Sequence, residues 1–256
     1  MVWDPAQYLK FAAPRLRPAA DLLARVPLDA PRDVVDLGCG AGNVTRLLHE
    51  RWPHASITGV DDSAAMLASA RAALPRLRWV ERGIADWTPD APPDLLWSNA
   101  ALHWLPDHAT LFPRLARALA PGGVLAVQMP RNFEAPSHAL VGETVRSGPW
   151  RARLEPLLAP PPVAAPAAYL DALAPFAAEL DVWETEYLQL LDGEDPVKEF
   201  TKGTFLRPFL DAIADEAERA AFEADYAARL RVAYPRRADG RTPFPFRRLF
   251  LVMRRA

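Results

Sequence analysis

The stretch that most constrains the fold is residues 33–43, DVVDLGCGAGN. An apolar run with two valines leads into three glycines, at positions 38, 40 and 42, and NVTRLLHERW then follows with helical periodicity. This pattern predicts a strand, a tight glycine turn and a helix. Glycine lets the backbone approach a ligand closely, and the helix N-terminus offers unpaired N–H groups. We therefore expect a nucleotide-like ligand over this turn.

The spacing of the glycines indicates which ligand this is. A dinucleotide-binding turn needs a third small residue where Asn43 stands, so the dehydrogenase pattern fails. The pattern D-x-G-x-G-x-G, which begins at Asp36, resembles the first motif of the Rossmann-like S-adenosylmethionine-dependent methyltransferases. The resemblance implies that Asp36 helps to organise the methionine end of this cofactor. It also implies that the turn passes beneath the cofactor, with contacts from Gly38, Cys39, Gly40 and Asn43.

A second acidic position strengthens this interpretation. The segment ASITGVDD (55–62) predicts a short strand that ends at Asp61, and a carboxylate there can accept both ribose hydroxyls of an adenosine. Alternatively, Asp61, Asp62 and Ser63 only cap the helix that follows. We expect both roles: Asp61 binds the cofactor, Asp62 lies beside it, and Asp62 or Ser63 caps the helix.

Composition narrows the class of protein. A chain of 256 residues suits one α/β domain, and a net charge of −2 gives no reason to expect nucleic acid or an anionic membrane as a partner. Cys39 is the only cysteine, which argues against a disulfide framework and a thiolate metal site. No apolar run reaches the ~18 residues that a membrane span needs. We expect a cytoplasmic monomer that acts on a small molecule and holds no metal.

Two further strands are expected to end at the same site. The resemblance implies that, after the strand within 77–87, Ile84 packs against the adenine ring, and that the acidic residue that meets the adenine amino group is either replaced by Gly83 or shifted to Asp86. The strand within 92–107 ends near Asn99, which we assign to the cofactor. His103 and Trp104 follow and are candidates for the substrate, although a single histidine is more often structural.

The remaining segments complete an α/β fold of seven strands. The expected sheet is mostly parallel with an antiparallel last strand, and helices cover both faces. We expect a single domain made of an N-terminal strap (1–32), a cofactor-binding core (33–190), a helical cap (191–245) and the last strand (246–256). Trp3 and Tyr8 lie in the strap, where they either pack or enclose the substrate.

A narrower resemblance covers nearly the whole chain. The chain resembles the trans-aconitate methyltransferase family in the segments WDPAQYLKF, SNAALHWLPDH, TFLRPFL and the terminal RRLFLV. It departs from that family at two positions: His103 stands where the family commonly keeps Gln, and Gly83 stands where it commonly keeps an acidic residue. The resemblance implies formation of a methyl ester on a carboxylate of trans-aconitate. A carboxylate is already ionised at pH 7 and needs no general base.

A tricarboxylate calls for arginine forks. Arg207 and Arg248 are the candidates for the substrate, and Arg15 or Arg17 for the carboxylate of the cofactor, each against the alternative of an ordinary surface arginine. Another small carboxylic acid is the main rival acceptor. A nicotinamide oxidoreductase is disfavoured by Asn43 and by the lack of a Tyr-x-x-x-Lys pair, and a non-catalytic binding module is disfavoured by the long cap.

Overall fold

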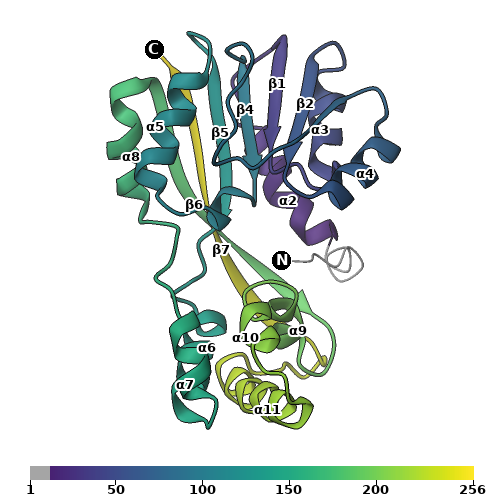
Figure 1. The fold of residues 1–256 in the computed structure, drawn as a ribbon, viewed down its shortest axis with the longest axis vertical. Coiled ribbons are helices and arrows are strands. Elements are labelled where there is room, and N and C mark those ends of the chain that lie inside the picture. Colours follow the sequence, from purple (N-terminus) through teal and green to yellow (C-terminus); the bar gives the residue numbers. More distant parts are fainter. Residues whose placement is uncertain (1–11) are drawn as a thin grey trace. The chain divides into compact units, whose positions relative to one another are not determined.

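In the computed structural model, which describes residues 12–256, seven strands form one sheet of order β3-β2-β1-β4-β5-β7-β6 (Figure 1). Strands β1 to β5 pair in parallel, and β7 runs antiparallel to β5. The predicted sheet is therefore confirmed. The strands are β1 (Asp33–Leu37), β2 (Ser56–Asp61), β3 (Arg78–Glu81), β4 (Leu95–Asn99), β5 (Val124–Pro130), β6 (Ala177–Leu191) and β7 (Thr242–Arg255).

The helices are α2 (Ala12–Leu23), α3 (Asn43–Arg51), α4 (Ala64–Ala73), α5 (His108–Ala118), α6 (Pro136–Ser147), α7 (Arg151–Leu154), α8 (Pro166–Leu173), α9 (Pro196–Lys202), α10 (Arg207–Asp211) and α11 (Glu216–Ala233). Short 3-10 turns are η1 (Leu102–Trp104), η2 (Glu155–Leu157) and η3 (Ala174–Phe176). Within residues 12–256, no helix is long and apolar enough to cross a bilayer.

The central strands form where the sequence is apolar on both faces. Leu95, Leu96 and Trp97 of β4 are all fully buried, as are Val124 and most of the residues that follow it in β5. A continuous apolar run of this kind is typical of a parallel strand that helices cover on both sides. The strand order changes direction between β1 and β4, which directs their carboxyl ends toward a ligand crevice.

The chain forms two compact units. The sheet unit contains residues 13–130, 162–185 and 248–256, and the helical unit contains the other described residues, which are 12, 131–161 and 186–247. Strands β6 and β7 each continue from one unit into the other. Strand β7 begins at Thr242, whereas the expected last strand began at 246.

The helical unit has a core of its own. Val141 and Val145 of α6 join the buried cluster that contains Phe222 and Tyr226 of α11 and Phe244 of β7. Residues 131–161, which we expected within the cofactor-binding core, therefore pack with the helices of the expected cap. The reason is that the apolar stripe of α6 is buried against α11.

Candidate functional site

The glycine turn has one packed side and one open side. Gly38 has φ +74°, and a Cβ on it would lie 2.2 Å from the Cβ of Ala101. Gly40 has φ +54°, and a Cβ on it would meet nothing within 4 Å. Positive φ values favour glycine at both positions. The turn is therefore packed against the segment after β4 at Gly38, and it leaves the space beside Gly40 open.

Asp61 joins this turn to the start of α4. One carboxylate oxygen accepts a hydrogen bond from the backbone N–H of Gly40, and the other accepts one from the N–H of Ser63, both at 2.9 Å. Ser63 is the cap, since its hydroxyl accepts from the N–H of Met66, whereas Asp62 is exposed. Each carboxylate oxygen keeps a free lone pair, so Asp61 can still accept further donors.

Asp36 lies beneath the turn, with 1% of its surface exposed. The hydroxyl of Thr45 donates to one of its carboxylate oxygens at 2.6 Å. Burial raises the pKa of Asp36 to about 7, the Thr45 hydrogen bond opposes this rise, and the charge of Asp61 adds to it. A cation near Asp36 would favour its ionised form. Thr45 was not predicted from the sequence, because only folding brings the first turn of α3 against β1.

The segment after β3 is held by an arginine that the sequence analysis also missed. Arg114 of α5 donates to the carbonyl oxygens of Ile84, at 2.7 Å, and Trp87, at 2.6 Å. Ile84 is buried, Asp86 is exposed, and a Cβ on Gly83 would meet nothing within 4 Å. Arg114 thus fixes the backbone of the segment that we assigned to the adenine.

Four polar side chains gather at the carboxyl ends of β4 and β5. Asn99 of β4 is the register partner of Gln128 of β5. Arg248 of β7 is buried, with 6% of its surface exposed, and its Nη1 donates to Oε1 of Gln128 at 3.2 Å. Within the described residues, Oδ1 of Asn99, Nε2 of Gln128 and Nδ1 of His103 are buried and have no hydrogen-bond partner. Such atoms indicate a polar site that a ligand can complete.

His103 lies in η1, beside Trp104, with their ring centroids 4.6 Å apart. Burial, together with the charges of Arg248 and His108, lowers the pKa of His103 to about 3. His103 is therefore neutral at pH 7. Trp104 is 45% exposed.

His108, at the start of α5, supports η1 from behind. Its Nε2 lies 2.9 Å from the carbonyl oxygen of Leu102, and its Nδ1 lies 2.6 Å from the hydroxyl of Tyr169. A carbonyl only accepts, so Nε2 carries the proton and Nδ1 accepts from the tyrosine hydroxyl. This pair was not predicted from the sequence, because Tyr169 lies on α8, far from His108 in the chain.

The other candidates lie in varied settings. Arg207 is exposed on α10, and its Nε is 2.7 Å from the carboxylate of Asp211, one helical turn away. Arg17 is exposed on α2, and Asn43 is exposed at the start of α3. Cys39 is buried in the turn, where burial raises the pKa of its thiol. Trp3 and Tyr8 lie outside the described residues.

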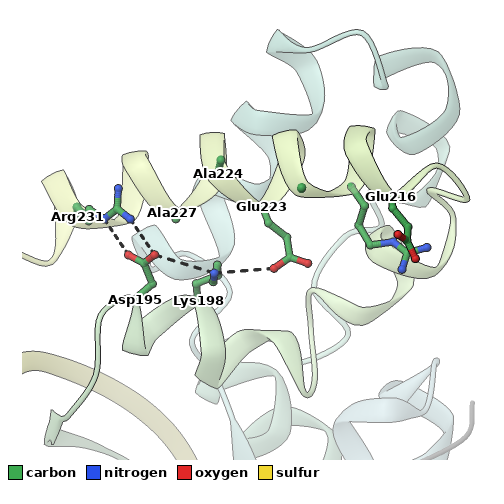
Figure 2. A pocket seen from close by; sticks show the side chains of 9 residues that line it. Asp195, Lys198, Glu216, Glu223, Ala224, Ala227 and Arg231 are labelled. Atoms are coloured by element: carbon green, nitrogen blue, oxygen red, sulfur yellow. Dashed lines mark hydrogen bonds and ion pairs between the residues drawn. The ribbon is translucent and has the colours of Figure 1, made fainter.

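The helical unit contains a cavity of about 460 Å³ between α9 and α11 (Figure 2). Its lining contains two ion pairs: Arg231 binds Asp195 through two hydrogen bonds of 2.8 Å, and Lys198 lies 3.8 Å from Glu223. Because the three acidic and three basic side chains that line the cavity balance in charge, we assign no ligand to it.

The comparisons with known proteins agree with this geometry. A methyltransferase domain model matches residues 34–123. The fold is similar to that of the YcgJ protein from Bacillus subtilis (TM-score 0.61, 14% identity, 93% of this chain and 98% of that one). It is also similar to an S-adenosylmethionine-dependent methyltransferase from Mesorhizobium loti (TM-score 0.52, 24% identity, 92% and 96%).

The sheet order, the glycine turn and the acidic residues at the ends of β1 and β2 define an S-adenosylmethionine-dependent methyltransferase. Trans-aconitate 2-methyltransferase from Azoarcus sp. is 55% identical over 98% of both chains. That from Methylobacterium nodulans is 54% identical over 99% of this chain and 98% of its own. The chain belongs to the trans-aconitate 2-methyltransferase family.

Proposed function

We propose that this enzyme forms a methyl ester on a carboxylate of trans-aconitate, the compound for which its relatives are named. The observation that carries the proposal is the buried guanidinium of Arg248 at the carboxyl ends of the strands, in the unit that also holds the glycine turn. A buried arginine suits an anionic acceptor. We also propose that the enzyme acts as a cytoplasmic monomer without nucleic-acid or membrane partners.

The residues around the turn fit the cofactor. Gly40 leaves open space, Asp61 has lone pairs for the ribose hydroxyls, and the unpartnered Oδ1 of Asn99 suits a cationic group. The buried carboxylate of Asp36 favours positive charge nearby. When bound, the cofactor supplies an electrophilic methyl group that a carboxylate oxygen takes up as an ester, leaving S-adenosylhomocysteine.

The proposed reaction requires the enzyme to position the acceptor carboxylate, and it requires no proton transfer. An acceptor carboxylate with an ordinary pKa near ~4 is ionised at pH 7. His103, whose pKa is about 3, binds a proton too weakly to act as an effective general base at neutral pH. We therefore give Arg248 and His103 the role of orienting the acceptor, and Trp104 that of covering it. For Arg207, a role in acceptor binding would require breaking its pair with Asp211.

The proposal is tested by a screen of small carboxylic acids with labelled S-adenosylmethionine. We expect trans-aconitate to give the highest kcat/KM and an alkali-labile methyl ester as the product. A higher kcat/KM for another di- or tricarboxylic acid would mean that this other acid is the acceptor, while the assigned reaction, methyl ester formation, would stand. Methylation of neutral acceptors alone would contradict the proposal.

A separate prediction concerns the cofactor. Asp61→Ala should weaken binding of S-adenosylhomocysteine by about 1–3 kcal/mol, since the ribose hydroxyls lose an acceptor and the N–H of Gly40 loses its partner. Titration calorimetry measures the change. The neighbouring and exposed Asp62→Ala is the matched control, and equal losses in both variants would contradict the role of Asp61.

A further inference from the structure

We propose that Gln128 is a specificity residue for the acceptor: its amide holds Arg248 in place and donates to the same carboxylate. The inference rests on the proposed function, because it names a second group that recognises the carboxylic acid. Gln128 was not among the residues expected from the sequence. It lies on β5 and is completely buried.

The contact with Arg248 fixes which way the amide of Gln128 faces. A guanidinium can only donate, so the atom of Gln128 that lies 3.2 Å from Nη1 of Arg248 must be the carbonyl oxygen. The NH₂ group therefore points elsewhere. Its nitrogen is buried and has no hydrogen-bond partner within the described residues. A buried donor without an acceptor is unfavourable. A ligand that supplies the acceptor would remove this cost.

The strand register places the two donors together. Phe250 pairs with Gln128 in the antiparallel ladder, and Arg248 pairs with Pro130, so the side chains of Gln128 and Arg248 are on one face of the sheet. A carboxylate has two oxygens with several lone pairs. One carboxylate can therefore accept from both the guanidinium and the amide, which a chloride or a neutral carbonyl group would match less well.

The neighbouring strand offers the opposite polarity. Among residues 12–256, Asn99, the register partner of Gln128, has a buried oxygen without a donor, whereas Gln128 has a buried nitrogen without an acceptor. The first suits the cationic end of the cofactor and the second suits an anion. Gln128 and Arg248 thus mark the acceptor side of the site. The neutral amide of Gln128 accepts a hydrogen bond from Arg248 and leaves the positive charge of Arg248 in place. A glutamate at this position would neutralise that charge.

The test compares Gln128→Met and Gln128→Glu with the unmutated enzyme. We expect Gln128→Met to raise the KM for the acceptor by about tenfold, and Gln128→Glu by about 100-fold, since the new carboxylate pairs with Arg248 and repels the acceptor. Both variants should bind S-adenosylhomocysteine within about twofold of the unmutated enzyme. Gln189→Met is the matched control: it also removes a side-chain amide with a buried atom that has no partner among residues 12–256, in this case the oxygen, but from β6, and should leave this KM unchanged.

The outcomes separate this inference from the proposed function. If the unmutated enzyme esterifies a carboxylic acid and the Gln128 variants keep its KM, the role of Gln128 is wrong and the proposed function stands. If both variants lose kcat, cofactor affinity and melting temperature together at constant KM, Gln128 is only structural and the inference is overturned. If the unmutated enzyme esterifies no carboxylic acid, both proposals fail.

Discussion

Arg248→Ala is expected to lower kcat/KM for trans-aconitate by roughly 30- to 5,000-fold, which corresponds to about 2–5 kcal/mol. The guanidinium of Arg248 is 6% exposed, so an anion bound beside it is only weakly screened by water. Removing it leaves the acceptor carboxylate without its cationic partner at a desolvated site. Binding of S-adenosylhomocysteine should stay nearly unchanged, because the residues that we assign to the cofactor lie on elements other than β7.

The adjacent arginine provides the matched control. Arg247 is exposed, and its side chain is on the opposite face of β7 because side chains alternate along a strand. Arg247→Ala should leave kcat/KM within about twofold of the unmutated enzyme. Initial rates at saturating S-adenosylmethionine measure both variants. A loss in Arg247→Ala as large as that in Arg248→Ala would show that overall charge, and not the buried fork, attracts the acceptor.

Much of the fold could be predicted from local signals. The local patterns of residues 33–43 and 55–62 were enough to predict the glycine turn after β1 and the acidic end of β2. The apolar run through β4 likewise indicates a buried parallel strand. The membership of α6 and α7 could not be predicted, because an apolar stripe shows that a helix packs but not which partner it packs against.

The site was harder to predict, because its chemistry depends on register. Arg207 and Arg248 look alike in an arginine-rich sequence, yet one is paired at the surface and the other is buried. Gln128 and Arg114 make their contacts with elements that are distant in the chain, and Thr45 meets Asp36 only because α3 packs against β1. The sequence alone does not show that buried polar atoms of Asn99, Gln128 and His103 have no hydrogen-bond partner among residues 12–256, because this depends on the three-dimensional position of every neighbouring group.

The second large effect concerns acid stability and His138 of the helical unit. The His138 ring packs against Phe133 and Phe205, and burial lowers its pKa to about 4. In the unfolded chain the pKa returns to about 6.5. Between these values the unfolded state binds more protons, so the free energy of unfolding falls as pH falls, by about 1.4 kcal/mol per pH unit for this histidine. From pH 6.5 to pH 4 the loss is about 3 kcal/mol.

Other buried groups act at the same time. His103 acts in the same direction as His138, whereas Asp36, whose pKa is raised to about 7, binds a proton in the folded state and opposes the loss. A single substitution isolates the contribution of His138. His138→Gln cannot titrate but can still hydrogen bond to Ser137, the partner of the imidazole. It should flatten the slope of unfolding free energy against pH by about 1.4 kcal/mol per unit between pH 6.5 and pH 4.

Urea unfolding at pH 7.5, 6.5, 5.5 and 4.5 measures this slope in both proteins. The matched control is His54→Gln, which makes the same substitution at an exposed position. It should change the slope far less than His138→Gln does. At pH 7.5 the folded and unfolded states carry His138 in the same neutral form, so any stability difference there reports packing alone. An unchanged slope in His138→Gln would mean that this imidazole is hydrated in the folded enzyme, and that the acid sensitivity arises elsewhere.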